Sequence, residues 1–362
     1  MSIRLRKWVS VSVVVPIAMI ASACGSANGT TASGSNATCT PSDSPTITFL
    51  AYSTPQAVYD AKLIPAFKSA WKSDHNGQIV NFLESYGPST TQAQNVVNGQ
   101  DADVVALSLA PDVDTIKNAG LITHDWTTDT DGGMVSSSVV VFDVHKGNPK
   151  GITDWNDLAQ PGLKVLTPDP QQSGGARWNL VSLWGSALRG DVSGVTKDDE
   201  AGATKLMQDI TGNVIAYDSS ARSSIQNFEG GNGDVAITYE NEVKTAQAAG
   251  LDDTAVYPKG SVLIQNPVAI VDKNVDKDCV RPVAEAFVKY LHTKEAKDFY
   301  TQNGYLRSTN EAEAKAGDPA NGYPAIQDLF TVQDLGGWDA LDTKLFDPTS
   351  GIATQAVANS GQ

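Results

Sequence analysis

The residues with the clearest potential for chemistry form one turn near the middle of the chain. Residues 167–179 read Thr-Pro-Asp-Pro-Gln-Gln-Ser-Gly-Gly-Ala-Arg-Trp-Asn, and a predicted strand ends here where a helix begins. Ser173 is a favourable N-cap, and Gly174 and Gly175 let the backbone approach a ligand closely. The free N–H groups and the dipole of the helix can then bind an anion. On composition alone, a plain helix cap with small packing residues is at least as good an explanation.

Two further turns have the same character. Residues 84–92 join a strand to a helix with Ser89 as the candidate N-cap, and residues 217–224 do so around Ala221. Each turn alone is weak evidence, because small polar residues are common wherever a helix starts. Three such turns in one chain favour an anion site built from helix N-termini.

Signatures of catalysis and of metal binding are missing from the sequence. It contains neither a G-x-S-x-G nucleophile elbow nor a G-x-x-x-x-G-K-[ST] phosphate loop, and its four histidines do not have metal-ligand spacing. A dispersed Ser-His-Asp triad stays open, although no residue pattern favours it. We therefore expect no enzyme, no metal and no cofactor.

The elements that must position these turns alternate between strand and helix. This order predicts an α/β fold with a mostly parallel sheet, in which ligands bind at the carboxyl ends of the strands. A last amphipathic helix is expected from Pro282 to a cap at Asn303-Gly304. The other expected strands are 46–52, 78–83, 103–110, 139–144, 164–167, 214–217 and 234–239, and the clearest helices are 89–98, 112–119 and 174–188.

The N-terminus is typical of an exported protein. Residues 1–23 combine a basic start with 16 mostly apolar residues, which suits a signal peptide better than a membrane-spanning helix. The sequence Ala-Ser-Ala before Cys24 predicts lipidation of Cys24, and ordinary cleavage after Ala23 is the alternative. Residues 24–45 are rich in Gly, Ser and Thr and are expected to form a flexible linker. Cys39 and Cys279 remain, either as one disulfide or as free thiols.

Composition narrows the class of protein further. The 362 residues carry a formal charge of −15, and removal of Arg4, Arg6 and Lys7 with the signal peptide would make it −18. With 41% hydrophobic and 19% charged residues, the chain is not a disordered acidic protein. The acidic balance argues against nucleic-acid binding and weakly suggests a cationic ligand. A chain of this length more often forms two compact parts than one.

Several motifs together resemble a known family. The run Ser173–Asn179 is similar to a signature of the sulfate-binding proteins of bacterial ABC importers, which are periplasmic binding proteins of type II. The resemblance extends from about Thr46 to Ile352. Supporting motifs are Lys146-Gly-Asn-Pro-Lys150, Asp154-Trp-Asn-Asp-Leu158, Gly233-Asp-Val with Glu240-Asn-Glu242, and Leu329-Phe-Thr with Gly336-Gly-Trp338.

This resemblance implies a two-lobed fold that closes on a dehydrated oxyanion. Lobe 1 would comprise residues 46–135 and 242–350, lobe 2 residues 136–241, and the C-terminal tail residues 351–362. A monomer held to the outer face of the membrane by its lipid would deliver sulfate to permease subunits. The implied ligand shell is Ser53, Ser89, Ser173, Gly174, Gly175, Ala221 and Tyr239, and Arg177 and Arg222 would lie behind it.

Two positions depart from the family pattern. Ser53 stands where Asp is common, which matters little if only its N–H binds. Tyr239 stands where a Trp donates, and a phenol reaches differently and can also accept. Thiosulfate, molybdate and phosphate therefore remain alternative ligands, and an exported serine hydrolase or a surface adhesin are the alternative classes.

Overall fold

The computed structural model describes Cys39 and residues 42–360. Cys24, the predicted signal peptide and most of the predicted linker lie outside these residues. The strands follow the order β2-β1-β3-β9-β4-β7-β5-β6, with β10 beside β9 and β8 beside β4. The sheet is mixed: β1, β2 and β3 pair in parallel, as do β5, β6 and β7, whereas β4 and β9 pair antiparallel to their neighbours in this order. This arrangement confirms the predicted α/β class.

The first lobe is built on three strands near the N-terminus. Its strand β1 (Thr46–Tyr52) lies between β2 (Asn81–Gly87) and β3 (Val104–Ala106). Apolar residues of β1 alternate with polar ones at its start, and the buried set includes Ile47 and Phe49. Its helices are α1 (Gln56–Val58), continued by a π-helical turn (Tyr59–Leu63), α2 (Ile64–Asp74), α3 (Ser89–Val97), α4 (Ala110–Asn118), α9 (Asp272–Lys277), α10 (Arg281–Leu291) and α11 (Lys294–Gln302).

The second lobe repeats the same strand-to-helix order. Strand β5 (Val165–Pro168) pairs in parallel with β6 (Val214–Asp218) and β7 (Val235–Tyr239). The long helix α5 (Gly174–Leu188) is buried along most of its length, in agreement with its predicted bounds. The remaining elements are α6 (Glu200–Thr211), α7 (Ala221–Glu229), α8 (Glu240–Ala248), β8 (Thr254–Val256), α12 (Glu311–Ala316), β10 (Asp328–Phe330), α13 (Gly337–Leu345) and α14 (Ile352–Asn359).

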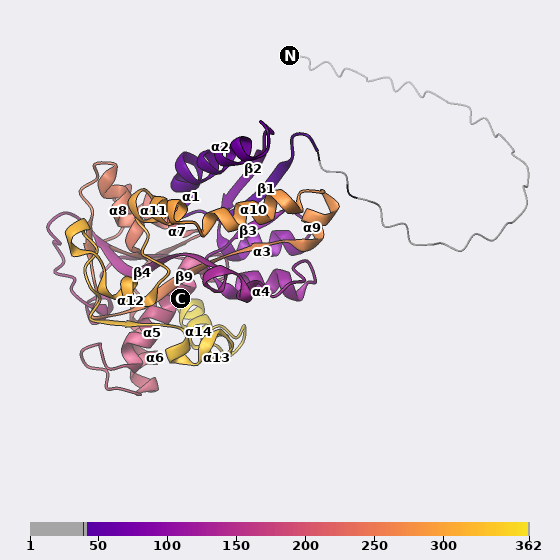
Figure 1. The fold of residues 1–362 in the computed structure, drawn as a ribbon. Helices are drawn as coiled ribbons and strands as arrows, with labels where there is room; N and C mark the ends of the chain where they lie inside the picture. The colour runs from indigo at the N-terminus through magenta and orange to yellow at the C-terminus, as the bar shows by residue number, and fades with distance from the viewer. Residues whose placement is uncertain (1–38, 40–41, 361–362) are drawn as a thin grey trace, which may run out of the picture. The chain divides into compact units, whose positions relative to one another are not determined.

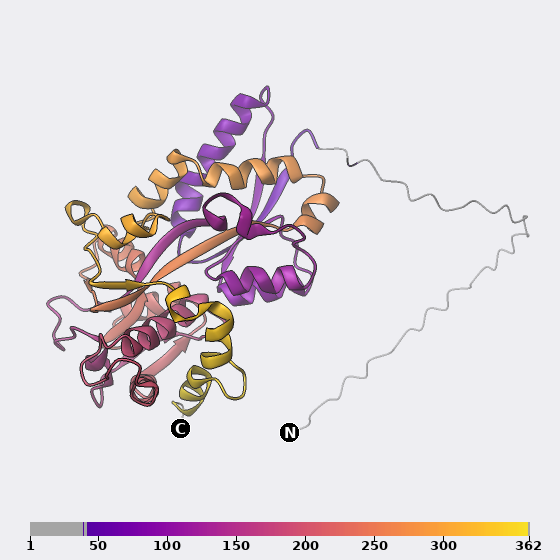
Figure 2. The ribbon, with the colours of Figure 1, turned by 60° about the horizontal axis from the view of Figure 1, so that its bottom comes forward.

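Two 11-residue strands cross between the lobes, β4 (Met134–Val144) and β9 (Gly260–Ile270). They lie side by side through the centre of the fold (Figures 1 and 2). Beyond their shared stretch, β4 continues beside β7 in the second lobe and β9 beside β3 in the first. Each strand therefore belongs to both lobes.

The sequence predicted only residues 139–144 of β4, because Ser136, Ser137 and Ser138 interrupt the apolar run. In the structure these serines are buried, and their hydroxyls donate to Asn266, Ser308 and Asn241. Buried hydroxyls with partners are tolerated inside a sheet, so the strand extends through them. Local polarity was therefore a misleading signal for the end of this strand.

The predicted last helix is two helices. α10 ends at Leu291, and the Thr293 hydroxyl then accepts a hydrogen bond from the N–H of Ala296 as the cap of α11. Thr is a good N-cap, so a new helix starts although the apolar pattern continues.

The C-terminal segment packs on the second lobe. Leu341 and Leu345 of α13 and Ala353 of α14 belong to the hydrophobic core that also holds Trp178 and Val181 of α5. The predicted boundary at residue 350 between lobe 1 and the C-terminal tail stays a prediction. Along residues 42–360, no helix has the length and apolar character needed to cross a membrane.

Cys39 and Cys279 form a disulfide that ties the N-terminal segment to the loop before α10. Its 240-residue separation restricts the unfolded chain strongly. We expect the double variant Cys39→Ser, Cys279→Ser to lose about 2–4 kcal/mol of unfolding free energy in denaturant titrations. The wild type under reducing agent should show the same loss. An unchanged midpoint in either sample would contradict this stabilising role.

Candidate functional site

All seven residues predicted as the ligand shell line one small cavity of about 10 Å³ between the lobes. They come from both lobes, and each lies where a strand ends and a helix begins. Further lining residues are Tyr52, Thr54, Gly87, Pro88, Ser108 and Ser220. No side chain among these 13 carries a formal charge at neutral pH.

Helix N-termini supply the donors of this cavity. Ser89, Gly174 and Ala221 are the first residues of α3, α5 and α7, and Gly175 follows in α5. The N–H groups at these positions have no partner within their own helix, which leaves them free for a ligand. Each of these helices also directs the positive end of its dipole into the cavity. The arrangement is suited to an anion.

The two glycines of α5 permit a very close approach. A Cβ atom on Gly174 would lie 2.7 Å from the Ser108 hydroxyl oxygen and 2.8 Å from Cγ of Leu109. One on Gly175 would lie 3.1 Å from Cβ of Ala221. The packing of Ser108 and Leu109 therefore restricts position 174 to glycine, whereas a side chain at position 175 would require Ala221 to move by a few tenths of an ångström. The sequence alone did not reveal these neighbours.

Ser173 occupies the predicted N-cap position of α5, and its side chain caps no helix N–H. Its backbone N–H donates to the carbonyl of Asp169 at 2.8 Å. The backbone of Ser173 is thereby held in place, and its hydroxyl is left available to the cavity.

Ser89 is not the N-cap of α3, as the sequence suggested, but its first residue, and Pro88 takes the N-cap position. The Ser89 hydroxyl donates to Asp112 at 2.5 Å and accepts the N–H of Ser108 at 2.8 Å. These two bonds commit the hydroxyl to the protein. Of the two groups on Ser89, the backbone N–H is therefore the one left for a ligand.

Burial raises the pKa of Asp112 to about 6, although the hydrogen bond from Ser89 favours the carboxylate. The folded-state pKa exceeds the unfolded value of about 4, so folding favours the protonated form and stability falls as the pH rises from about 4 to 6. An Asp112→Asn variant cannot ionise. It should exceed the wild type in unfolding free energy by roughly 1–3 kcal/mol at pH 7 and by far less at pH 4. An equal difference at both pH values in denaturant titrations would contradict this prediction.

Tyr239 ends β7 and is almost fully buried, with 1% of its surface exposed. Its hydroxyl lies 2.7 Å from the hydroxyl of Ser108. Desolvation raises the pKa of this phenol far above its ordinary value, so the group stays protonated at neutral pH. Tyr239 can therefore act as a hydrogen-bond donor in the cavity.

Ser108, Thr54 and Ser220 line the cavity but were not predicted. The sequence placed Ser108 inside a strand spanning 103–110, whereas β3 ends at Ala106 and α4 begins at Ala110. A serine two residues before a helix, in the segment Leu-Ser-Leu-Ala-Pro, was the available signal. It marks a further strand-to-helix turn at the cavity, between β3 and α4.

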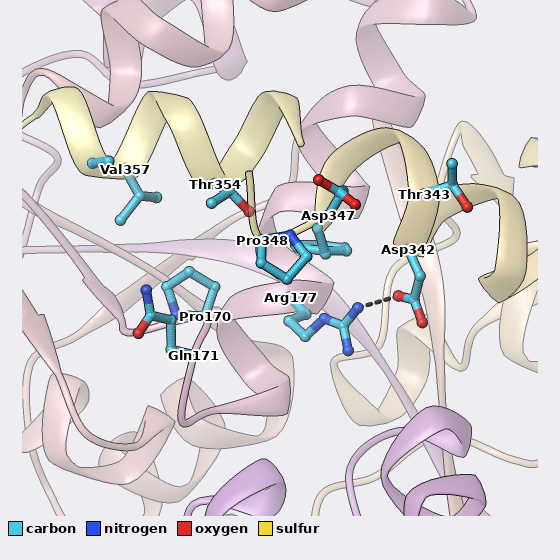
Figure 3. Close-up of a pocket in the computed structure, with 11 residues that line it drawn as sticks. Pro170, Gln171, Arg177, Asp342, Thr343, Asp347, Pro348, Thr354 and Val357 are labelled. Atoms are coloured by element: carbon cyan, nitrogen blue, oxygen red, sulfur yellow. Dashed lines mark hydrogen bonds and ion pairs between the residues drawn. The ribbon is translucent and has the colours of Figure 1, made fainter. Parts of the chain in front are cut away.

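The two arginines lie outside the cavity lining. Arg177 is paired with Asp342 of α13 and packs over the ring of Phe346. Figure 3 shows this pair on the wall of a separate, larger hollow. Pro170 and Gln171 line one side of that hollow, and α14 lines the other. Arg222 pairs with the buried Glu242 at 3.0 Å and donates to the carbonyl of Thr54 at 3.2 Å. Glu242 thus balances the charge nearest the cavity, and the Thr54 bond joins the lobes.

The hydrogen-bond donors of the cavity indicate which kind of ligand it can bind. Hydroxyl and N–H groups without a charged side chain suit a small ligand that is entirely an acceptor. Among the residues that the structure describes, no cluster of His, Cys, Asp and Glu could hold a metal ion. The uncharged donors of this cavity therefore suit an oxyanion.

The chain is similar to several known bacterial binding proteins. The family model described as bacterial extracellular solute-binding protein matches residues 47–306. The sulfate-binding protein of Synechococcus elongatus is 39% identical over 90% of this chain and 88% of its own length. That of Escherichia coli is 41% identical over 75% and 82%. The solved structure of the sulfate-binding protein SubI from Mycobacterium tuberculosis has a TM-score of 0.73 and 35% identity, covering 84% of this chain and 100% of its own.

Proposed function

Because the chain belongs to the bacterial extracellular solute-binding protein family, we propose that it captures sulfate outside the cytoplasm and passes it to an ABC import permease. Its curated relatives are named for sulfate binding, and a solved relative of the same name shares the fold. Such a protein binds and releases its ligand unchanged, so it is not an enzyme.

The observation that carries the proposal is the cavity lined by uncharged donors from both lobes. Desolvating a dianion costs several kcal/mol or more, and donors held in place before binding compensate for that cost. Helix N-termini provide such donors without a counter-ion. A ligand held without a cationic partner is also more easily released to a permease.

Discrimination against phosphate follows from the same donor set. Sulfate has no proton at neutral pH, so every partner should donate, whereas monohydrogen phosphate needs one acceptor. No carboxylate lines the cavity, and the nearby Asp112 is occupied by Ser89. These features favour sulfate or thiosulfate over phosphate. Molybdate remains the second tetrahedral candidate, and the anion panel below distinguishes it.

The mode of attachment is a further part of this proposal. The Ala-Ser-Ala sequence before Cys24 supports a lipid anchor on the outer face of the membrane. A protein tethered in this way would meet its permease as a monomer. Mass measurement of the N-terminal peptide after export would detect a lipidated Cys24, and an unmodified cysteine or cleavage elsewhere would contradict the anchor.

Thermal unfolding with a panel of anions tests the function. Sulfate should raise the unfolding temperature in proportion to the logarithm of its concentration, corresponding to about 2.7 kcal/mol at a hundredfold excess over Kd. Chloride at matched ionic strength is the control. If no oxyanion stabilises the protein, the proposal fails, and a larger shift with molybdate or phosphate would reassign the ligand.

A further inference from the structure

Ser108 and Tyr239 form a hydrogen-bonded pair across the cavity, 131 residues apart in sequence. Ser108 follows β3 of the first lobe, and Tyr239 ends β7 of the second. Both line the cavity, and both are 1% exposed. Their bond can form only when the two lobes are in contact.

The orientation of Ser108 is fixed by its backbone. Its N–H donates to the hydroxyl of Ser89 at 2.8 Å. Its carbonyl accepts from the indole N–H of Trp178 at 2.9 Å and from the amide of Asn266 at 3.1 Å. With both backbone groups held by α3, α5 and β9, the side chain is held in place toward Tyr239 and Gly174.

The hydroxyl protons of Ser108 and Tyr239 show that this pair can donate one hydrogen bond to a ligand. Two hydroxyl groups carry two protons, and their mutual hydrogen bond uses one of them. The other proton meets no acceptor within residues 42–360. A hydroxyl proton that has no acceptor in a buried site is energetically unfavourable. An anion in the cavity would accept it.

We propose that Ser108 and Tyr239 bind sulfate as a coupled pair, in which one hydroxyl donates to the anion and the other orients it. This inference rests on the proposed function and adds Ser108 to the binding residues. The shared hydrogen bond would leave this pair with one donor of defined direction.

The pair can be tested by titrating four proteins with sulfate in a calorimeter. The four are the wild type, Ser108→Ala, Tyr239→Phe and the double variant. Each single change should weaken binding about 10–100-fold, because each disturbs one charge-assisted hydrogen bond. Both changes remove the same interaction, so their effects should not multiply in the double variant. Its Kd should be at most about three times the Kd of the single variant that binds sulfate less tightly. The variant with the larger loss identifies the hydroxyl that contacts the anion.

The matched control is Ser224→Ala. Ser224 is a buried serine of α7 whose hydroxyl has no hydrogen-bond partner within the described part of the chain, and it does not line the cavity. It should bind sulfate like the wild type. Wild-type affinity in either single variant, or losses that multiply in the double variant, would overturn the pair. If wild type and Ser224→Ala both fail to bind, the proposed function itself is wrong. Unfolding temperatures of the ligand-free variants separate a binding defect from misfolding.

Discussion

The Gly174→Leu variant should show no stabilisation by sulfate, while the ligand-free protein still folds. Even the Cβ atom of a new side chain would lie 2.7 Å from the Ser108 hydroxyl oxygen and 2.8 Å from Leu109. The rest of the leucine would project farther into this contact between α5 and the residues that precede α4. The lobes could then close only by displacing the donors, and affinity should fall by at least a hundredfold. Thermal unfolding against sulfate concentration measures the loss.

The matched control for this change is Gly230→Leu. Gly230 follows α7 with a φ of −70°, and an added Cβ atom meets nothing nearer than 3.3 Å. This variant should keep the sulfate-dependent shift of the wild type. Retention of that shift in Gly174→Leu would show that the anion binds elsewhere. Circular dichroism of both ligand-free variants checks that each is folded.

The Arg307→Met variant should lose about 3–5 kcal/mol of unfolding free energy. Arg307 forms two parallel hydrogen bonds to Glu240, at 2.7 and 2.8 Å, and both side chains are almost completely buried. It also donates to the carbonyls of Ala314 and Pro324. Removing the guanidinium leaves a buried carboxylate without its counter-charge, which costs far more than the pair contributes. Denaturant titration at pH 7 measures the loss.

The comparison for Arg307 is an exposed ion pair on α11. Lys294 and Asp298 lie 2.6 Å apart, but the lysine side chain is 87% exposed. Lys294→Met should leave the unfolding midpoint unchanged, because solvent screens exposed pairs and both side chains lose entropy in forming them. Similar losses in the two variants would contradict the distinction between buried and exposed pairs. Glu240 directly follows Tyr239, so reduced sulfate affinity in folded Arg307→Met would further link this pair to the site.

Much of the candidate site could be expected from local patterns. Ser173, Gly174 and Gly175 indicate a helix start from local sequence alone, because the N-cap position and the first helical turn depend on residues a few positions apart. The same holds for Ala221 after its serines. Their meeting in one cavity followed from the α/β topology, since the carboxyl ends of the strands carry the turns.

Other features could not be obtained in this way. The serines of β4 look like a loop until Asn266 and Asn241 supply partners from distant parts of the chain. Ser108 looks like an ordinary strand residue until Tyr239 meets it from the other lobe. Whether a polar residue is buried in a strand or exposed in a loop can be predicted only when its hydrogen-bond partner is known, and the tertiary fold sets that partner.

By itself, the sequence determined the alternation of strands and helices and the glycine-rich helix starts, which favour an anion site. These properties depend on backbone conformation and on unpaired N–H groups, which nearby residues control. Only the tertiary structure decided that β4 and β9 are shared by both lobes, that Glu242 balances Arg222, and that Ser89 is committed to Asp112. Hydrogen bonds and charge pairs in a buried site are set by distances between segments far apart in the chain. The net charge of the molecule therefore says little about the cavity, whose lining is uncharged and rich in hydrogen-bond donors.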